Sequence, residues 1–417
     1  MASLIAEIQR SSRTLRPVAK EHVKDCSAPR IHDVHTEERQ QVAHETYYLD
    51  LGLDKWIPLV CDLTFETVSL PLSPAEAMLL RRCYKSLHGS DRATSPGRRS
   101  AASLHQPCLC TEDLNELVAL GRRIEPELAS IGDVDGAFVK LSGRSSKDAP
   151  LHTVRLRESC GRLASDEHGV MSAVVDKPLL LLFQAALRLM QVSCVPHALW
   201  LLINSDRVDE DLEVALRHQA RTWDQSVVLR RWWPGVTVDL EFRMFVVDHQ
   251  PTGLTQYNHL LYSPRVAKHK DVIGPALLTF FATHVAPRLR GRFLSRYVVD
   301  LAIDPEALTL AEWSPNGMRE GHPAVAMIEA RHIKLIELNC FYEATGMGLF
   351  DFHADAVTLS GQGDFEFRVL TEPLPHPEVR LEREWRDILS PTRGEGGVRM
   401  TDEAWEQIER AFTEIPA

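Results

Sequence analysis

Two largely apolar stretches in the second half of the chain are predicted to be β-strands, and the first of them is predicted to be a buried strand that carries one carboxylate. They are residues 297–303 (Tyr-Val-Val-Asp-Leu-Ala-Ile) and residues 333–339 (Ile-Lys-Leu-Ile-Glu-Leu-Asn). In a strand, side chains two positions apart project from the same face, so Glu337 and Asn339 are expected to point at one spot. If the two strands pair, Asp300 can join them there. The pattern predicts a sheet that carries two carboxylates and one carboxamide.

These three side chains offer the hard oxygen ligands that suit Mg2+ bound together with nucleotide phosphates. Apolar Ile336 and Leu338 alternate with them, however, so an ordinary strand with one solvated face explains the pattern equally well. The residues alone leave both interpretations open.

The same patterns predict a mixture of strands and helices along the rest of the chain. Residues 73–76 combine an N-cap serine, a proline at the first helical position and a glutamate three residues after the cap, which is typical of a helix start. Strands are predicted at residues 63–68, 136–141, 198–203, 226–231, 238–247, 253–258 and 366–370. Helices are predicted from residue 73 to about 84, from Thr111 until Pro126 bends or ends the helix, at 177–193, 208–223 and 377–389, and after Thr401. This mixture indicates the α+β class.

Two segments lack the apolar periodicity of a packed element. Residues 1–45 are rich in charge and poor in aromatics, and residues 86–107 are rich in Gly, Ser and Pro among basic residues. We therefore expect a flexible N-terminal arm and a disordered insertion. The remainder is expected to form an N-terminal lobe at 46–225, a C-terminal lobe at 226–375 and C-terminal helices at 376–417.

Composition and charge argue against several classes of protein. The 417 residues are 44% hydrophobic and 25% charged, which is ordinary for a soluble globular protein. The formal net charge of −11 argues against broad binding of nucleic acid, which needs a basic face. The eight cysteines follow no disulfide pattern, and the most apolar run, residues 178–190, is too short to span a membrane. We expect a reduced, cytoplasmic protein with neither a nucleic-acid nor a membrane partner.

A second chemically informative segment covers residues 136–150. A short strand brings Lys140 into a loop of small residues that contains Ser142, Arg144 and Lys147. Cationic side chains and exposed backbone N–H groups in such a loop can cradle phosphates, although many surface loops have this composition. The chain has neither a P-loop nor a dinucleotide-binding glycine motif.

A third segment is a strand at 226–231 that runs into a Trp-Trp-Pro turn, followed by Glu241 and Arg243 on one face of the next strand. A hinge of this kind presents backbone groups that can read an adenine edge. The acid can then hold a ribose, and the arginine can reach a phosphate. Alternatively, Glu241 and Arg243 form an ion pair with each other, and Trp232 and Trp233 are core or edge aromatics.

Nine short motifs occur in the order seen in the cell division cycle protein 123 (D123) family, and the chain resembles that family over roughly residues 47–355. The motifs are Trp56, residues 64–67, 70–73, 138–141 with 145–149, 229–230, 241–246, 256–258, 297–300 and 336–339. The resemblance implies a divergent ATP-grasp fold, in which two α+β lobes close on Mg-ATP.

The resemblance also implies roles for individual residues. Lys140 would contact ATP phosphates, Glu241 would contact the ribose or adenine side, and Arg243 would face the phosphates. Asp300, Glu337 and Asn339 would hold Mg2+. Other candidate ATP-binding residues are Ser142, Arg144 and Lys147 in the loop and Arg230, Arg231, Trp232 and Trp233 in the hinge.

The chain departs from the family pattern at two places. Residues 337–341 are Glu-Leu-Asn-Cys-Phe where the family usually has Asp-Phe-Asn-Pro-Phe, and Gly143 stands where an aromatic residue is usual. Glutamate preserves the ligand oxygen, so the departures indicate a divergent paralogue and bear on its partner more than on nucleotide binding.

Two functions are compatible with these observations. The first is an ATP-dependent assembly factor, or chaperone, for a protein complex such as translation initiation factor 2, acting through its gamma subunit or on another protein. The second is an ATP-grasp ligase that joins a carboxylate to an amine through an acyl phosphate. Whether the protein is an enzyme stays open at this point.

Overall fold

The computed structural model describes residues 45–89, 109–132, 135–166, 177–220, 222–312, 328–342, 345–381, 385 and 399–414. The chain divides into two compact units. Unit 1 comprises Met1–Thr64 and Gly235–Pro373, and unit 2 comprises Phe65–Pro234 and Leu374–Ala417. Residues 46–64 therefore join the later half of the chain, and the C-terminal helix joins the earlier half. Residues 1–44 of the arm expected at 1–45 and residues 90–107 of the insertion expected at 86–107 lie outside the described residues. Residues 86–88 belong to the helix Pro74–His88, so the expected insertion was wrong at its first residues.

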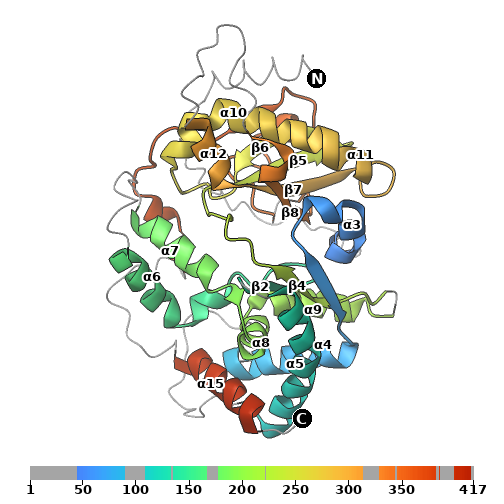
Figure 1. Cartoon of the computed structure of the whole chain (residues 1–417). Coiled ribbons are helices and arrows are strands. Elements are labelled where there is room, and N and C mark those ends of the chain that lie inside the picture. The colour runs from blue at the N-terminus through green and yellow to red at the C-terminus, as the bar shows by residue number, and fades with distance from the viewer. Residues whose placement is uncertain are drawn as a thin grey trace, which may run out of the picture. The chain divides into compact units, whose positions relative to one another are not determined.

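Unit 1 is built on a five-stranded sheet with the order β8-β7-β5-β6-β9 (Figure 1). The strands are β5 (Glu241–Val247), β6 (Gln250–Gln256), β7 (Arg296–Ile303), β8 (Ile333–Asn339) and β9 (Glu366–Arg368). Only β6 and β9 pair in parallel. A tight turn joins β5 to β6, in which Asp248 and His249 both have a positive φ, as the primed turns of β-hairpins require. The strands expected at 297–303 and 333–339 are confirmed.

Helices cover one face of this sheet. They are α10 (Pro264–Phe280), the π-helical turn η3 (Phe281–Val285) and α11 (Ala286–Leu289), which run across the sheet in Figure 1. Gly274 of α10 leaves room for the ring of Phe367, because a Cβ atom there would lie 2.8 Å from it. Phe367 is in register with Leu254, which is in register with Met244, so this apolar row faces α10. The shorter elements of unit 1 are α3 (Leu53–Val60), η1 (Cys61–Leu63), α12 (Pro305–Glu312), η4 (Ala330–His332) and α13 (Ala356–Leu359).

The helical stretch Pro264–Leu289 is long and apolar enough to cross a membrane by length and composition. Within unit 1, however, 56% of its apolar window is buried, which is usual for a core helix of a soluble protein.

Unit 2 contains a four-stranded antiparallel sheet with the order β1-β4-β2-β3. The strands are β1 (Thr67–Pro71), β2 (Ala137–Leu141), β3 (Gln191–Val192) and β4 (Ser226–Arg231). The helices are α4 (Pro74–His88), α5 (Thr111–Ile131), α6 (Arg155–Asp166), α7 (Lys177–Arg188), α8 (Val195–Ile203), α9 (Asp206–Arg217) and α15 (Arg399–Glu414), with η2 (Ala149–His152) and η5 (Pro377–Arg380). The capping box predicted at Ser73 and Glu76 is present at the start of α4.

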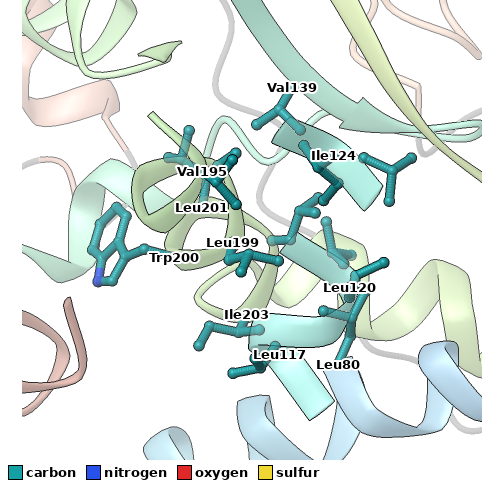
Figure 2. Close-up of a cluster of buried hydrophobic side chains, with 14 of the residues drawn as sticks. Leu80, Leu117, Leu120, Ile124, Val139, Val195, Leu199, Trp200, Leu201 and Ile203 are labelled. Atoms are coloured by element: carbon teal, nitrogen blue, oxygen red, sulfur yellow. The ribbon is translucent and has the colours of Figure 1, made fainter. Parts of the chain in front are cut away.

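The core of unit 2 forms where α4, α5 and α8 meet one face of the sheet. Figure 2 shows Leu80 of α4, Leu120 of α5 and Val139 of β2 around Leu199 of α8. The C-terminal helix α15 adds Ala404, Trp405 and Ile408 to the same core, so its apolar side is a packing surface. The two ends of unit 2 thus fold together although they are far apart in the sequence.

Several predicted elements were wrong. The strand predicted at 198–203 is part of helix α8, which is buried at every position except Pro196 and therefore shows no helical periodicity. The strand predicted at 63–68 begins only at Thr67, because η1 occupies Cys61–Leu63. Of the two outcomes expected at Pro126, a bend or an end of the helix, the end is wrong, because α5 continues to Ile131. A regular helix does not begin at Pro377, where the described residues form the single turn η5, and α15 begins two residues before Thr401.

Candidate functional site

A row of polar residues crosses all five strands of unit 1 on the face opposite to α10. Residues paired directly across a sheet project from the same face, so the register places their side chains side by side. The row consists of Arg368 (β9), Thr255 (β6), Arg243 (β5), Asp300 (β7) and Glu337 (β8). Three of the residues that the sequence assigned to the site are therefore neighbours in this row.

Asp300 and Arg243 form a buried, bidentate ion pair at the centre of this row. Arg243 donates from Nε to Oδ1 of Asp300 at 2.8 Å and from Nη2 to Oδ2 at 2.7 Å. The two side chains are only 8% and 2% exposed. Asn339 donates from Nδ2 to Oδ2 of Asp300 at 2.8 Å, so the structure brings Asp300 and Asn339 together as expected.

Glu337 lies next to this pair and beside an irregularity in the sheet. Asp300 faces Glu337, but Leu301 faces Leu335, so Ile336 is an extra residue in β8. Such a β-bulge locally twists the strand and redirects the side chains beside it. Glu337 is half-buried, whereas Asp300 is fully buried.

Three of the described residues contact the Arg243 guanidinium. Besides Asp300, it donates from Nη1 to the carbonyl oxygen of Gly346, and its guanidinium lies 4.7 Å from the centre of the Tyr257 ring. Burial acts to lower the pKa of Arg243, but the charge and hydrogen bonds of Asp300 raise it above its usual range. The ion pair of Arg243 is made with Asp300 on the neighbouring strand. The hydrogen bonds to Asp300 and Gly346 use three of the five N–H groups of the guanidinium, so Arg243 is held mainly by the protein itself.

The charges of this cluster decide which kind of metal it fits. Two carboxylates (Asp300, Glu337) and one guanidinium (Arg243) give a local net charge of −1. That charge is low for a site that binds a divalent cation on its own, but it suits Mg2+ that arrives with nucleotide phosphates, because these supply further oxygen ligands and negative charge. Across the part of the chain that the structure describes, no group of three or more His, Cys, Asp or Glu residues is arranged to hold a metal ion.

In unit 2, two buried cations lie on the sheet face opposite to the apolar core. Lys140 is 2% exposed and Arg230 is 3% exposed. Phe138 pairs with Arg230 and Lys140 pairs with Val228, so the two cations are diagonal neighbours on β2 and β4. The guanidinium of Arg230 lies 4.7 Å from the centre of the Phe65 ring. Lys140, a predicted phosphate contact, and Arg230, a predicted hinge residue, are thus close together.

The loop after β2 is fastened to its surroundings. The Ser142 hydroxyl accepts a hydrogen bond from the Ser226 backbone N–H at 2.9 Å. Arg144 turns towards α9, where its Nε donates to Asp211 at 2.7 Å and its Nη2 contacts Glu210 at 3.0 Å. Lys147, by contrast, is exposed. The structure therefore directs the Arg144 side chain to helix α9.

One buried polar atom in this loop lacks a hydrogen-bond partner among the described residues. The Ser146 hydroxyl is completely buried and has no hydrogen-bond partner among the described residues. A buried hydroxyl left in this state costs roughly 1–3 kcal/mol. An orphaned donor beside Lys140 and Ser145, which form a β-bridge, fits a loop that takes up a further oxygen-rich group.

Two backbone N–H groups of the predicted adenine hinge already form hydrogen bonds within unit 2. The N–H of Arg231 donates to the Glu66 carbonyl at 2.8 Å, and that of Trp232 donates to the Gly136 carbonyl at 3.0 Å. The Arg231 side chain also pairs with Glu66 at 2.7 Å. Trp232 packs against the core of unit 2, and the ring of Trp233 lies 5.8 Å from that of Phe65. Reading of an adenine edge would therefore fall to the backbone from Trp233 onwards.

Sequence reasoning missed the groups that hold Arg243 in place. Tyr257 belongs to one of the nine motifs but had no role attached, and Gly346 opens a Gly-Met-Gly segment. Gly348 has a φ of +61°, and a Cβ atom there would lie 2.5 Å from Thr255. This glycine-dependent close approach to the polar row is the signal that could have identified the segment.

Comparison with known proteins gives a matching family model and several similar structures, two of which are described below. Residues 183–384 match the family model D123. The structure of Cdc123 from Schizosaccharomyces pombe is similar at 18% identity and a TM-score of 0.47, covering 79% of this chain and 98% of that chain. A C-terminally truncated form of the same protein gives 17% identity, a TM-score of 0.48 and the same coverage. No curated protein matches this sequence.

Proposed function

The chain belongs to the D123 family, and from that membership we propose that it binds ATP with Mg2+ and acts as an ATP-dependent assembly factor for a protein complex. The observation that carries the proposal is the cluster of Asp300, Glu337 and Asn339 on one sheet face, with Arg243 in contact with Asp300. The expected ATP-grasp behaviour, in which two lobes close on Mg-ATP, is part of this proposal.

The residues of the cluster have two kinds of task in this proposal. Asp300, Glu337 and Asn339 supply oxygen ligands for Mg2+, which would neutralise phosphate charge when bound. Arg243 compensates the charge of Asp300 and fixes the orientation of its carboxylate through two hydrogen bonds. The family resemblance assigns phosphate contacts to residues of unit 2, Lys140 among them.

In unit 2, Lys140 and Arg230 are the cations that support this assignment best. Both are buried on the polar face of the sheet, and hydrogen bonds from cations to phosphate oxygens are stronger than those from neutral donors. Lys147 adds an exposed cation in the loop, and the orphaned Ser146 hydroxyl adds a donor. Ser142 and Arg144 act one step further away, because their side chains hold the loop to Ser226 and to α9.

The proposed partner is a protein. By resemblance to the family, it is translation initiation factor 2, contacted through its gamma subunit, or another complex assembled in the cytoplasm. In this role the nucleotide stabilises one arrangement of the protein that the partner recognises.

A thermal shift experiment tests nucleotide binding. A ligand that binds only the native state at 100 times its Kd adds about 2.7 kcal/mol of stability. In domains of 150–250 residues this corresponds to roughly 5–11 °C in Tm. We expect that shift with millimolar Mg-ATP and little shift with Mg2+ alone, because the local charge of the cluster is only −1. An unchanged Tm in Mg-ATP would contradict the proposal.

A binding assay tests the role in assembly. The purified gamma subunit of translation initiation factor 2 is immobilised and the protein is added with Mg-ATP, with ATP and a chelator, or with Mg2+ alone. Retention that depends on Mg-ATP supports the assembly role. Normal Mg-ATP binding without retention would confine the proposal to nucleotide binding.

A further inference from the structure

Tyr47 lies between the ends of the two strands that carry the metal-side residues. It belongs to the helical segment 45–49 of unit 1. Its hydroxyl donates to the carbonyl oxygen of Arg296 at 2.7 Å and accepts from the backbone N–H of Phe341 at 3.0 Å. Arg296 begins β7, and Phe341 lies two residues beyond the end of β8. One side chain therefore bridges β7 and β8 at the end of the ladder.

The register shows what this bridge replaces. The last ladder pair at this end is Val298 with Asn339. Two residues further, Arg296 faces Phe341, and a regular ladder would join Phe341 N–H directly to Arg296 C=O at about 2.9 Å. In this protein two hydrogen bonds with the hydroxyl between them take the place of that single bond. The two strands are consequently held further apart at this end than a closed ladder would hold them.

The separated end lies directly beside the polar cluster. Asn339 is the last residue of β8, and its amide nitrogen donates to Asp300 on β7 at 2.8 Å. Aromatic contacts fix the same end: the Arg296 guanidinium lies 4.3 Å from the centre of the Phe341 ring, which packs against Phe245 at 5.7 Å. Closing the ladder would move β8 towards β7 within two residues of Asn339.

We propose that Tyr47 is a positioning residue for the metal-side ligands, and that its hydroxyl sets the separation of β7 and β8 at which Glu337 and Asn339 meet Asp300. This inference rests on the proposed binding of Mg-ATP and adds to it a link to the helical segment 45–49, which lies far from β7 and β8 in the sequence. Tyr47 touches neither metal nor nucleotide in this arrangement. It acts only through the strands.

The hydroxyl has to be protonated for this role, because it donates to one strand and accepts from the other. Burial is the main reason why the pKa of Tyr47 is raised to about 12. The bridge is therefore intact throughout the neutral pH range, and the link is not itself a pH switch.

The test compares Tyr47→Phe with Tyr262→Phe in the full chain. Tyr262 is a half-buried tyrosine of the same unit whose hydroxyl makes no hydrogen bond among the described residues, so it controls for the loss of a phenol. Calorimetric titration measures the affinity for ATP with Mg2+ and with a chelator. Amide hydrogen exchange is followed at Phe341 and Asn339.

For Tyr47→Phe we expect faster exchange at Phe341 and a loss of about tenfold in Mg-ATP affinity, the order of one strong hydrogen bond. Affinity for metal-free ATP should change less than about twofold, and Tyr262→Phe should behave as wild type. A merely structural tyrosine would lower stability without changing the Mg2+-dependent part of the affinity.

The two failures can be told apart. If the wild type binds Mg-ATP and Tyr47→Phe binds it equally well, the role of Tyr47 is overturned while the proposed function stands. If Tyr47→Phe weakens metal-free and Mg-ATP binding to the same extent, positioning of the metal side is likewise overturned. If the wild type does not bind Mg-ATP at all, the proposed function fails first, and this inference fails with it.

Discussion

Replacing Asp300 by asparagine tests the ion pair at the centre of the site. The change keeps the shape of the side chain but removes the charge that holds the Arg243 guanidinium through bonds of 2.8 Å and 2.7 Å. Both side chains are under 10% exposed, so Arg243 would stay buried with its charge uncompensated. Removing one partner of such a pair costs roughly 3–5 kcal/mol. At roughly 2–4 °C per kcal/mol for domains of 150–250 residues, Tm should fall by roughly 6–20 °C.

A double-mutant cycle separates the energy of the ion pair from the effect of replacing each residue alone. Arg243→Met alone leaves the Asp300 carboxylate buried, and it too should destabilise the protein. The double variant Arg243→Met/Asp300→Asn removes both charges and should be less destabilised than the sum of the single variants, with a coupling of roughly 1–3 kcal/mol. Urea unfolding followed by circular dichroism at pH 7 measures all four proteins. A loss below about 1 kcal/mol in Asp300→Asn, or strict additivity, would refute the reasoning.

Two further predictions concern the proposed metal ligand Glu337 and the pH dependence of stability. Glu337→Gln should lower Mg-ATP affinity steeply, and the stability of the metal-free protein should stay within roughly 0.5 kcal/mol of wild type or rise slightly, because the repulsion by Asp300 is removed. Calorimetric titration with and without Mg2+ measures this affinity. An unchanged Mg-ATP affinity would count against Glu337 as a ligand. His197 is 9% exposed, and burial lowers its pKa to about 4. Between about pH 4 and 6.5 the unfolded chain therefore binds a proton at this residue that the native state does not bind. Above this pH range His197 should contribute up to about 3 kcal/mol to the free energy of unfolding, and this contribution is lost as the pH falls through the range. Urea unfolding at pH 5 and 7 should show a smaller pH dependence in His197→Phe than in the wild type, and equal dependence would contradict this assignment.

The part of the site on β7 and β8 could be predicted because its signal is local. Glu337 and Asn339 are two residues apart in a strand of period two, and pairing of two apolar strands brings Asp300 to them. The partner of Arg243 could not be predicted in this way. Glu241 is two residues away on the same strand and Asp300 is 57 residues away, and only the register of β5 with β7 decides between them.

Other elements carried no usable local signal. Helix α8 is apolar nearly all round, so its sequence fits a buried strand as well as a buried helix. The apolar positions around Trp405 do not show where this helix packs, and the structure places Trp405 against Trp200 and His197 of helix α8, which is far away in the sequence. Tyr47 acts through hydrogen bonds to Arg296 and Phe341, which are far from it in the sequence, so no local spacing reveals these contacts.

The loop after β2 gives a last prediction, in which two cations that look alike in the sequence should behave differently. Arg144 donates from its backbone N–H and its Nε to Asp211, whose side chain is 3% exposed. Arg144→Gln removes the charge facing that buried carboxylate, so it should lower the free energy of unfolding by roughly 1–3 kcal/mol. Because the guanidinium is already bound to α9, Mg-ATP affinity should stay within about twofold of wild type, a change of under 0.5 kcal/mol.

Lys147→Gln is the matched control in the same loop. Lys147 is exposed, so its replacement should change stability by no more than roughly 0.5 kcal/mol. If Lys147 contacts a phosphate, the loss of its charge should weaken Mg-ATP binding and make the remaining affinity less sensitive to salt. Urea unfolding and calorimetric titration of both variants at two salt concentrations give the comparison. A larger loss of Mg-ATP affinity in Arg144→Gln than in Lys147→Gln would show that Arg144 leaves Asp211 to bind the nucleotide, and that its contact with α9 describes only the protein without ligand.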